Sequence, residues 1–310
     1  VLDKSGKPIL EAAGRNGMAR GPFAAAGADG TSMLVVPNAR VDGVKGRTVF
    51  LVNHIEYQPS GPNVDPAKAP VELYGRLPMA MNLTVLDQDP ATGMLRPIKI
   101  SNVDFSEVQG LWIPCNSSPT PWMTHLGSEE YEPDARAFET KPLEPMNLYL
   151  GTLGKTAAEG GANAYNYGHL VEVKVDAAGA TKVVKHFAMG RLAFELGDVM
   201  PDRRTVFMGD DGDDVILAMF VADTAEDLSA GTLYAAKWQQ TNGADYGAAN
   251  LAWIRLGHAN NAEIAALIAG GVRFSDIWDV AEPAAVAATP AKYEGFKPIY
   301  AYPGTGSKKA

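Results

Sequence analysis

The chain has 310 residues, of which 46% are hydrophobic and 20% are charged, so it can bury a substantial core and lacks the composition of a disordered protein. It carries 27 Lys and Arg residues against 36 Asp and Glu residues, a net charge of -9 that disfavours nucleic acid as an obligate partner. No stretch approaches the ~18 consecutive apolar residues of a membrane-spanning helix, so we expect no membrane insertion. The single cysteine, Cys115, has no partner within the chain for a disulfide.

Short segments rich in β-branched, aromatic and other apolar residues predict a mostly β protein. In chain order these strands cover residues 48–52, 82–86, 170–175, 182–187, 205–208, 215–221 and 232–238. Segments 87–93 and 176–179 contain Asp and Gly and are typical of hairpin loops. Residues 262–269 predict a helix, because Ile264, Leu267 and Ile268 share one face.

Many short strands, together with 32 Gly and 21 Pro, suggest a sandwich, a barrel or a propeller. No sharp repeat of about 40 residues is visible, so periodicity does not choose among them. Residues 57–80 and 112–146 are expected to be long irregular loops, which in a compact domain are functional or disordered. We expect a single domain over residues 1–310, truncated at its C-terminus, with residues 283–310 as a linker-like tail.

The densest group of chemically active residues lies between Cys115 and Tyr131 and includes His125, Glu129 and Glu130. A thiolate suits iron or zinc, whereas carboxylates suit calcium, magnesium or iron. On an extended segment Glu129 and Glu130 point to opposite sides, so they serve one site only if the backbone is irregular there. The alternative is a buried free cysteine that packs as a small hydrophobe, beside two glutamates on a solvated face.

Three shorter groups also carry candidate residues. Residues 209–214 contain four Asp, which either bind a cation or form an acidic hairpin tip. Arg191 and Glu195 follow a predicted strand and offer a phosphate fork and a metal ligand, or only a surface ion pair. Residues 53–56 place metal-ligating side chains at the exit of a buried strand, or form a capping turn.

Several common catalytic motifs are absent from the sequence. It has no Gly-x-Ser-x-Gly elbow, no P-loop and no dinucleotide fingerprint. It also lacks a His-Glu-x-x-His zinc helix, and its five histidines are scattered along the chain. A serine hydrolase triad, a P-loop nucleotide site and a histidine-rich zinc cage are therefore unsupported.

Taken in chain order, these four segments resemble the PhoX-type alkaline phosphatases. The family block Cys-x-x-x-x-Thr-Pro-Trp-x-Thr-x-Leu-x-x-Glu-Glu is matched at full spacing by residues 115–130. The other matching positions are Asn53 and His54 after a strand, Gly190, Arg191, Leu192 and Glu195, and Gly209, Asp210 and Asp211 before a strand with Phe220.

This resemblance implies an all-β fold, namely a β-propeller with long irregular insertions and a few short helices. It implies hydrolysis of phosphate monoesters by a cluster of Fe3+ and Ca2+. It also implies export by the twin-arginine route, so that the protein is periplasmic or secreted.

The resemblance also implies roles for individual residues. Cys115 and Glu195 are expected to hold iron, and Arg191 is the candidate for a catalytic contact with phosphate. The full set of implied metal ligands is Asn53, Glu56, Cys115, Glu129, Glu130, Glu195, Asp210 and Asp211. Two other functions stay open: a non-catalytic calcium-binding propeller that presents a partner surface, and a calcium-dependent lactonase or phosphotriesterase. A metal-bound Cys115 separates the first function from these two, because calcium does not prefer sulfur.

Overall fold

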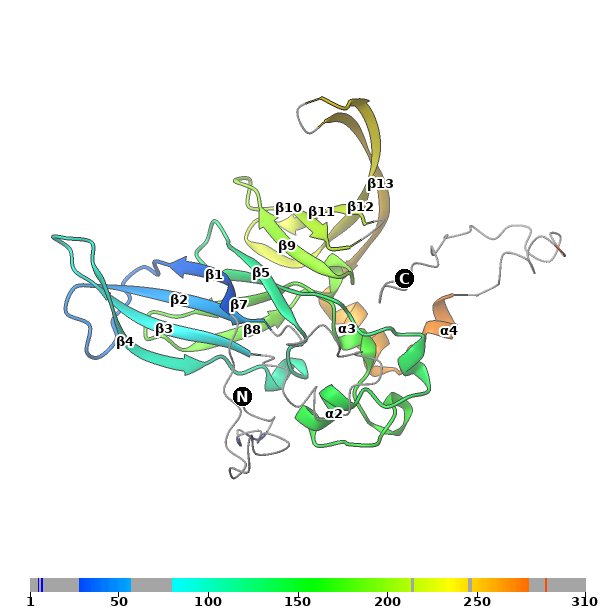
Figure 1. The fold of residues 1–310 in the computed structure, drawn as a ribbon, viewed down its shortest axis with the longest axis horizontal. Helices are drawn as coiled ribbons and strands as arrows, with labels where there is room; N and C mark the ends of the chain where they lie inside the picture. The colour runs from blue at the N-terminus through cyan, green and yellow to red at the C-terminus, as the bar shows by residue number, and fades with distance from the viewer. Residues whose placement is uncertain are drawn as a thin grey trace.

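The computed structural model describes residues 28–56, 80–212, 215–244 and 247–278, together with Ser5, Lys7 and Ala288. In these ranges the strands form three antiparallel sheets (Figure 1). The first sheet, in spatial order, consists of β1 (Ala28–Leu34), β2 (Arg47–Ile55), β3 (Ala80–Gln88) and β4 (Leu95–Asn102). The prediction of a mostly β protein is thus confirmed.

The other two sheets are also built from strands that follow one another along the chain. The second sheet consists of β5 (Pro114–Pro119), β6 (His125–Glu129), β7 (Val171–Val175) and β8 (Thr181–Lys185). The third sheet consists of β9 (Phe194–Val199), β10 (Thr205–Asp210), β11 (Leu217–Thr224), β12 (Asp227–Asn242) and β13 (Ala248–Asn260). The long hairpin of β12 and β13 extends from this sheet as a curved arm (Figure 1).

The first strands of the three sheets meet. β5 packs against both β1 and β9, so β1, β5 and β9 lie next to one another although about 80 residues separate each from the next. Meandering sheets that meet through their first strands are the arrangement found in propeller blades. Closure into a propeller stays a prediction.

Two hydrophobic cores lie on opposite faces of the second sheet. Phe50, Leu83 and Val173 belong to the core shared by the first and second sheets. Leu126 and Phe220 belong to the core shared by the second and third sheets. Because apolar neighbours cover both faces, every residue of β6 is buried, and its sequence shows no alternation of polar and apolar side chains.

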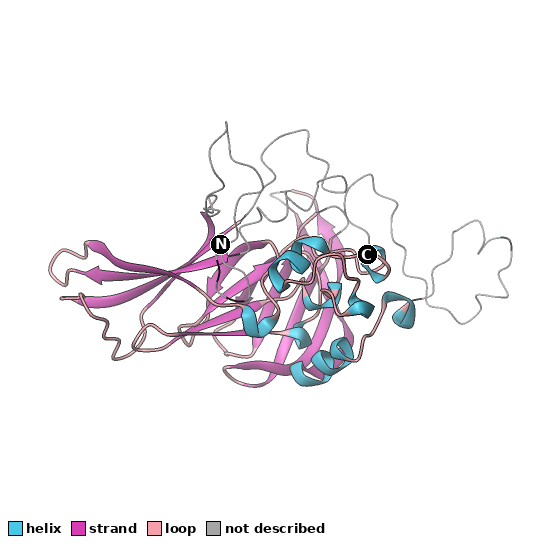
Figure 2. Ribbon diagram, turned by 90° about the horizontal axis from the view of Figure 1, so that it is seen from below, coloured by secondary structure: helices cyan, strands magenta, loops and turns pink. Residues whose placement is uncertain are grey.

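The helices are short and lie together beside the strands (Figure 2). They are α2 (Glu144–Leu150), α3 (Asn261–Ala269) and α4 (Phe274–Ile277), with single 3₁₀ turns between strands. The predicted helix at 262–269 is confirmed as α3. Asn260 caps α3 by accepting a hydrogen bond from the Glu263 amide, and the Glu263 side chain accepts one from the Asn260 amide in return.

The seven predicted strands all exist, with shifted ends. The strand expected at 182–187 stops at Lys185, because residues 187–189 form a 3₁₀ turn. The strand expected at 232–238 is much longer, since β12 pairs with β13 over most of its length. The sequence interpretation missed β1, β4, β5, β6, β9 and β13.

The prediction that residues 112–146 form an irregular loop is wrong in part, because β5 and β6 form a hairpin inside this segment. β5 lies at the edge of its sheet, and an edge strand tolerates Pro114 and Pro119 at its ends. The other predicted loop, at residues 57–80, lies outside the described residues except for its last residue. The predicted tail at 283–310 also lies outside them, apart from Ala288.

The core between the second and third sheets predicts that two aromatic residues of the third sheet contribute differently to the free energy of unfolding. Phe220 is fully buried, so Phe220→Ala should lower the free energy of unfolding by about 3–5 kcal/mol. Trp238 is 58% exposed, so Trp238→Ala should change it by no more than about 0.5 kcal/mol. Urea denaturation followed by circular dichroism measures both values. Equal losses would contradict the placement of this core.

Candidate metal centre

Six side chains with metal-ligating atoms occupy equivalent places in the three sheets. Asp29, Cys115 and Glu195 are each the second residue of the first strand of their sheet. Glu56, Glu130 and Asp211 each follow the last residue of the second strand of their sheet. The hairpins β1–β2, β5–β6 and β9–β10 thus contribute one pair of residues each.

The backbone pairing of the three hairpins shows the same equivalence. In each hairpin the first residue of the first strand pairs with the last residue of the second strand: Ala28 with Ile55, Pro114 with Glu129, and Phe194 with Asp210. The register shifts directly after each of these pairs.

The residues at these shifts lie in β-bulges. Two residues, Asp29 and Gly30, stand opposite one residue of β2, and Cys115 and Asn116 stand opposite one residue of β6. In the third hairpin Glu195 is the extra residue. A bulge changes the direction of a side chain relative to the regular strand, and bulges are common next to active sites. Here three bulges direct three side chains toward the place where the first strands meet.

Cys115 is the centre of a cluster that also contains Asp29, Glu56, Glu130 and Glu195, here called the acidic cluster. Its Sγ lies 3.3 Å from Oδ2 of Asp29 and 3.4 Å from Oε2 of Glu195. Two groups of ligand atoms share this sulfur: Asp29, Glu56 and Cys115 in one, and Cys115, Glu130 and Glu195 in the other. Within each group all ligand atoms lie within 4.8 Å of one another. Cys115 and Glu130 are buried, Glu56 and Glu195 are half-buried, and Asp29 is exposed.

Asp211 and Tyr131 extend the cluster. The Tyr131 hydroxyl donates a 2.8 Å hydrogen bond to the Asp211 carboxylate. Tyr131 directly follows Glu130 and has a φ of 48°, a left-handed conformation that a non-glycine residue rarely adopts. Such backbone strain is concentrated at functional sites, where the surrounding structure maintains it.

The cluster is unfavourable without a cation. Among the ion pairs of the described residues, none involves Asp29, Glu130 or Glu195. Burial, together with a hydrogen bond between Glu130 and Asp211, raises the pKa of Glu130 to about 8. Burial and the charge of Glu130 also raise the pKa of the Cys115 thiol far above its usual value. A thiol beside the carboxylates of Asp29, Glu130 and Glu195 offers the donor types that iron and calcium bind, so the residues fit these ions.

Comparison with known proteins identifies the family. The sequence profile of the family described as alkaline phosphatase PhoX matches residues 75–297, which is most of the chain. The chain belongs to the PhoX alkaline phosphatase family. No curated protein and no solved structure matches the chain.

The ligands expected from the PhoX resemblance fall into two sets. Glu56, Cys115, Glu130 and Glu195 lie in the cluster, and Asp211 adjoins it through Tyr131 and Glu130. Asn53 lies in β2, where its amide oxygen accepts a 2.6 Å hydrogen bond from Thr31. Asp210 is the last residue of β10 and does not belong to the two groups around Cys115.

Glu129 faces away from the cluster, as expected for neighbouring residues of an extended strand. Its carboxylate forms a fully buried ion pair with Lys185 at 2.8 Å. It also accepts hydrogen bonds from the backbone amides of Trp112, Gly168 and His169, at 2.7–3.1 Å. Glu129 thus connects the second sheet to the segments beside it.

Arg191 is half-buried and donates hydrogen bonds to three backbone carbonyls. Its Nε donates to Tyr167 at 2.8 Å, and its Nη2 donates to Ala164 at 3.3 Å and to Pro133. Among the ion pairs of the described residues none joins Arg191 to Glu195, so the alternative of a surface ion pair between them is not supported. In this arrangement Arg191 holds the segment before α2 against the segment before β7.

Asp29 is the site residue that sequence reasoning missed. It precedes Gly30 in a stretch whose strand was not predicted, and no nearby motif marks it as a ligand. Its only signal is its equivalence to Cys115 and Glu195, which becomes visible once the register of the three hairpins is known.

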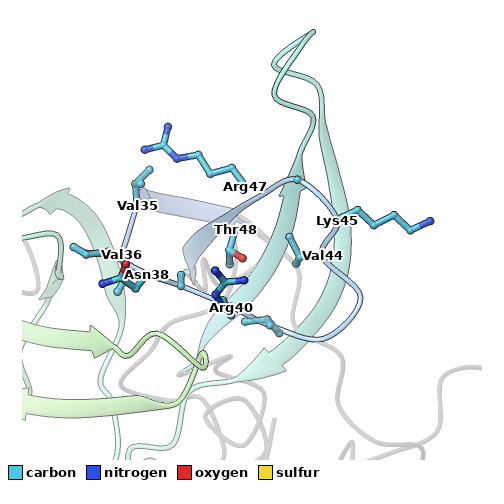
Figure 3. Close-up of a pocket in the computed structure, with 12 residues that line it drawn as sticks. Val35, Val36, Asn38, Arg40, Val44, Lys45, Arg47 and Thr48 are labelled. Atoms are coloured by element: carbon cyan, nitrogen blue, oxygen red, sulfur yellow. The ribbon is translucent and has the colours of Figure 1, made fainter.

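A separate cavity of about 430 Å3 lies in the connection between β1 and β2. Arg40 lies beside Thr48 there, whereas Lys45 and Arg47 point away from each other (Figure 3). None of the residues that line this cavity belongs to the acidic cluster.

None of the helices in the described ranges has the length and apolar character needed to cross a bilayer.

The contrast between Glu129 and Glu130 yields a prediction for the metal-free protein. Glu129→Gln leaves Lys185 buried without its counter-charge and should lower the free energy of unfolding by about 3–5 kcal/mol. Glu130→Gln removes an unfavourable buried carboxyl from the cluster and should raise it by about 0.5–2 kcal/mol. Urea denaturation in chelator measures both. Destabilisation by Glu130→Gln as large as that by Glu129→Gln would show that Glu130 is a structural residue.

Proposed function

We propose that this chain is a metal-dependent alkaline phosphatase that hydrolyses phosphate monoesters through an iron–calcium cluster held around Cys115. Membership of the PhoX family supports phosphatase activity in general. The observation that supports the cluster is the position of the Cys115 sulfur at the intersection of two groups of carboxylates. We also propose that the enzyme works in the periplasm or outside the cell, after export.

The two groups suggest how the cations are divided. Cys115, Glu130 and Glu195 form the more buried group and combine a soft donor with hard ones, which suits iron. Asp29 and Glu56 are more exposed and offer oxygen atoms only, which suits calcium with waters completing its coordination. Cys115 lies between the two positions.

The acidic cluster is consistent with phosphatase activity only when cations are present. Phosphate monoesters are dianions, which the carboxylates alone would repel. When bound, the cations supply the positive charge that attracts the phosphoryl oxygens and stabilises the charge developing on them. The protein contributes a fixed arrangement of ligands: three bulges aim the side chains, and the Tyr131 hydroxyl holds Asp211 from the exposed side.

Arg191 has a different relation to the substrate from the one that the resemblance implies. The Nε and Nη2 atoms of Arg191 donate to the carbonyls of Tyr167, Ala164 and Pro133, which leaves Nη1 as the donor for a contact with phosphate. We therefore propose that Arg191 contributes first by positioning these segments.

Substitution of Cys115 tests the iron position. Cys115→Ser should lower the iron content of the purified protein and abolish hydrolysis of p-nitrophenyl phosphate, because a neutral hydroxyl replaces the thiolate. Elemental analysis and a colorimetric assay measure the two effects, and circular dichroism confirms that the variant is folded. A folded variant with unchanged iron and activity would refute the iron site. Calcium binding without any iron in the wild type would instead favour the non-catalytic propeller or the lactonase.

Removal of calcium tests the second metal. A calcium-selective chelator should lower activity and melting temperature together, because a ligand present at 100 times its dissociation constant stabilises the folded state by about 2.7 kcal/mol. Adding calcium back should restore both, as measured by the same assay and by differential scanning calorimetry. If activity persists in excess chelator, the cluster does not need calcium.

A further inference from the structure

The backbone carbonyls of the bulge residues Cys115 and Glu195 each face a hydrogen-bond donor from a neighbouring sheet. His54 Nδ1 lies 2.5 Å from the carbonyl oxygen of Cys115. The Ser128 hydroxyl lies 3.0 Å from the carbonyl oxygen of Glu195 and 2.9 Å from that of Asn116. Thus a residue of the first sheet contacts the bulge of the second, and a residue of the second sheet contacts the bulge of the third.

The two donors occupy the same structural position. His54 is the penultimate residue of β2 and Ser128 is the penultimate residue of β6, each two residues before a carboxylate of the cluster. Each also stands opposite the bulge of its own sheet. The third sheet has Gly209 at this position, without a side chain to donate.

We propose that His54 and Ser128 are positioning residues, each of which holds the bulge of the next sheet so that Cys115 or Glu195 presents its side chain to the cluster. This proposal rests on the proposed metal centre and adds the means by which two of its ligands are oriented. A bulge residue is not held by regular strand pairing, so another contact must fix its peptide plane. Without the donor, a buried carbonyl would be unsatisfied and the peptide could rotate.

The hydrogen bonds that join Ser32, His125, His54 and the Cys115 carbonyl all run in the same direction. A carbonyl only accepts, so His54 carries its proton on Nδ1, and its Nε2 accepts from Nε2 of His125, 2.7 Å away. Nδ1 of His125 then accepts from the Ser32 hydroxyl at 2.9 Å. Ser32, His125 and His54 thus form a chain of donors that ends at the Cys115 carbonyl.

Both imidazoles are fully buried. A neutral imidazole has one donor and one acceptor nitrogen, which matches the partners of each ring.

Two glycines leave room for these contacts. A Cβ at Gly127 would lie 2.5 Å from Nε2 of His54, and a Cβ at Gly30 would lie 2.5 Å from the carbonyl oxygen of Cys115. Larger residues at either place would displace the His54 ring or the Cys115 peptide. The approach of the first and second sheets at the bulge thus depends on both positions.

The main test compares Ser128→Ala with Ser118→Ala in the full chain. Ser118 is a matched control, because its buried hydroxyl donates a 2.7 Å hydrogen bond to the carbonyl of Gly197, also between the second and third sheets, but away from the bulge residues. The melting temperature should fall by a similar amount in both variants. Because Ser128 orients Glu195 of the group proposed for iron, Ser128→Ala should bind iron about 10–100-fold more weakly and retain less of it, the usual range for removal of a group that orients a ligand. Ser118→Ala should bind both metals as the wild type does.

His54 supplies a second comparison. His54→Asn keeps an N–H near the position of Nδ1, whereas His54→Leu removes it, so the Asn variant should retain more metal than the Leu variant. Calcium affinity is measured by titration calorimetry with CaCl2, and iron by elemental analysis. In a 15N spectrum the wild type should show a protonated Nδ1 for His54 and a protonated Nε2 for His125.

Each outcome separates the two proposals. Equal metal binding by Ser128→Ala and Ser118→Ala, with a wild type that binds metal, overturns the positioning role and leaves the metal centre intact. A wild type that binds neither iron nor calcium overturns the metal centre and the positioning role together. The opposite protonation of His54 would overturn the direction of the hydrogen-bond chain.

Discussion

The proposed metal centre depends on the β-bulge at the start of the first strand in each sheet. Regular strands would direct Asp29, Cys115 and Glu195 along the pleat of their own sheets. The bulges turn these side chains toward the place where β1, β5 and β9 meet. The same bulges leave carbonyl groups outside regular pairing, and these groups need donors from elsewhere. Ligand direction and contacts between sheets are therefore two consequences of one backbone feature.

The adjacent residues Glu129 and Glu130 have different roles: one stabilises the fold and the other belongs to the acidic cluster. Glu129 and Glu130 are both buried and lie on opposite sides of the chain. Glu129 has a buried lysine and three backbone amides, so its charge is compensated within the fold. Burial and a hydrogen bond between Glu130 and Asp211 disfavour the ionised form of Glu130. In the proposed metal centre a cation compensates this charge, so folding tolerates at Glu130 an unfavourable group that metal binding stabilises.

Sequence patterns predicted the parts of the fold in which local rules act alone. Strands with apolar runs, such as β7 and β10, and the capped helix α3 were predicted close to their observed ends. β6 was missed because burial on both faces removes the alternation that marks a strand. The block from Cys115 to Glu130 was found from its residue types, but which glutamate faces the cluster depends on strand register. Asp29 could not be found, because its role arises from contacts with residues more than 80 positions away.

The repetition in this structure belongs to the backbone and not to the residue types. Three hairpins place a ligand at the same bulge, yet the side chains are Asp, Cys and Glu, so comparison of residue types along the chain reveals no repeat. The penultimate positions differ in the same way: His54, Ser128 and Gly209 are each the residue before the last of the second strand, and they differ in chemistry. Identical ligands in all three hairpins would favour a symmetric site for one kind of ion. Different ligands on a repeated backbone allow one sulfur to stand between oxygen-rich positions, and this asymmetry is what a site for two kinds of cation requires.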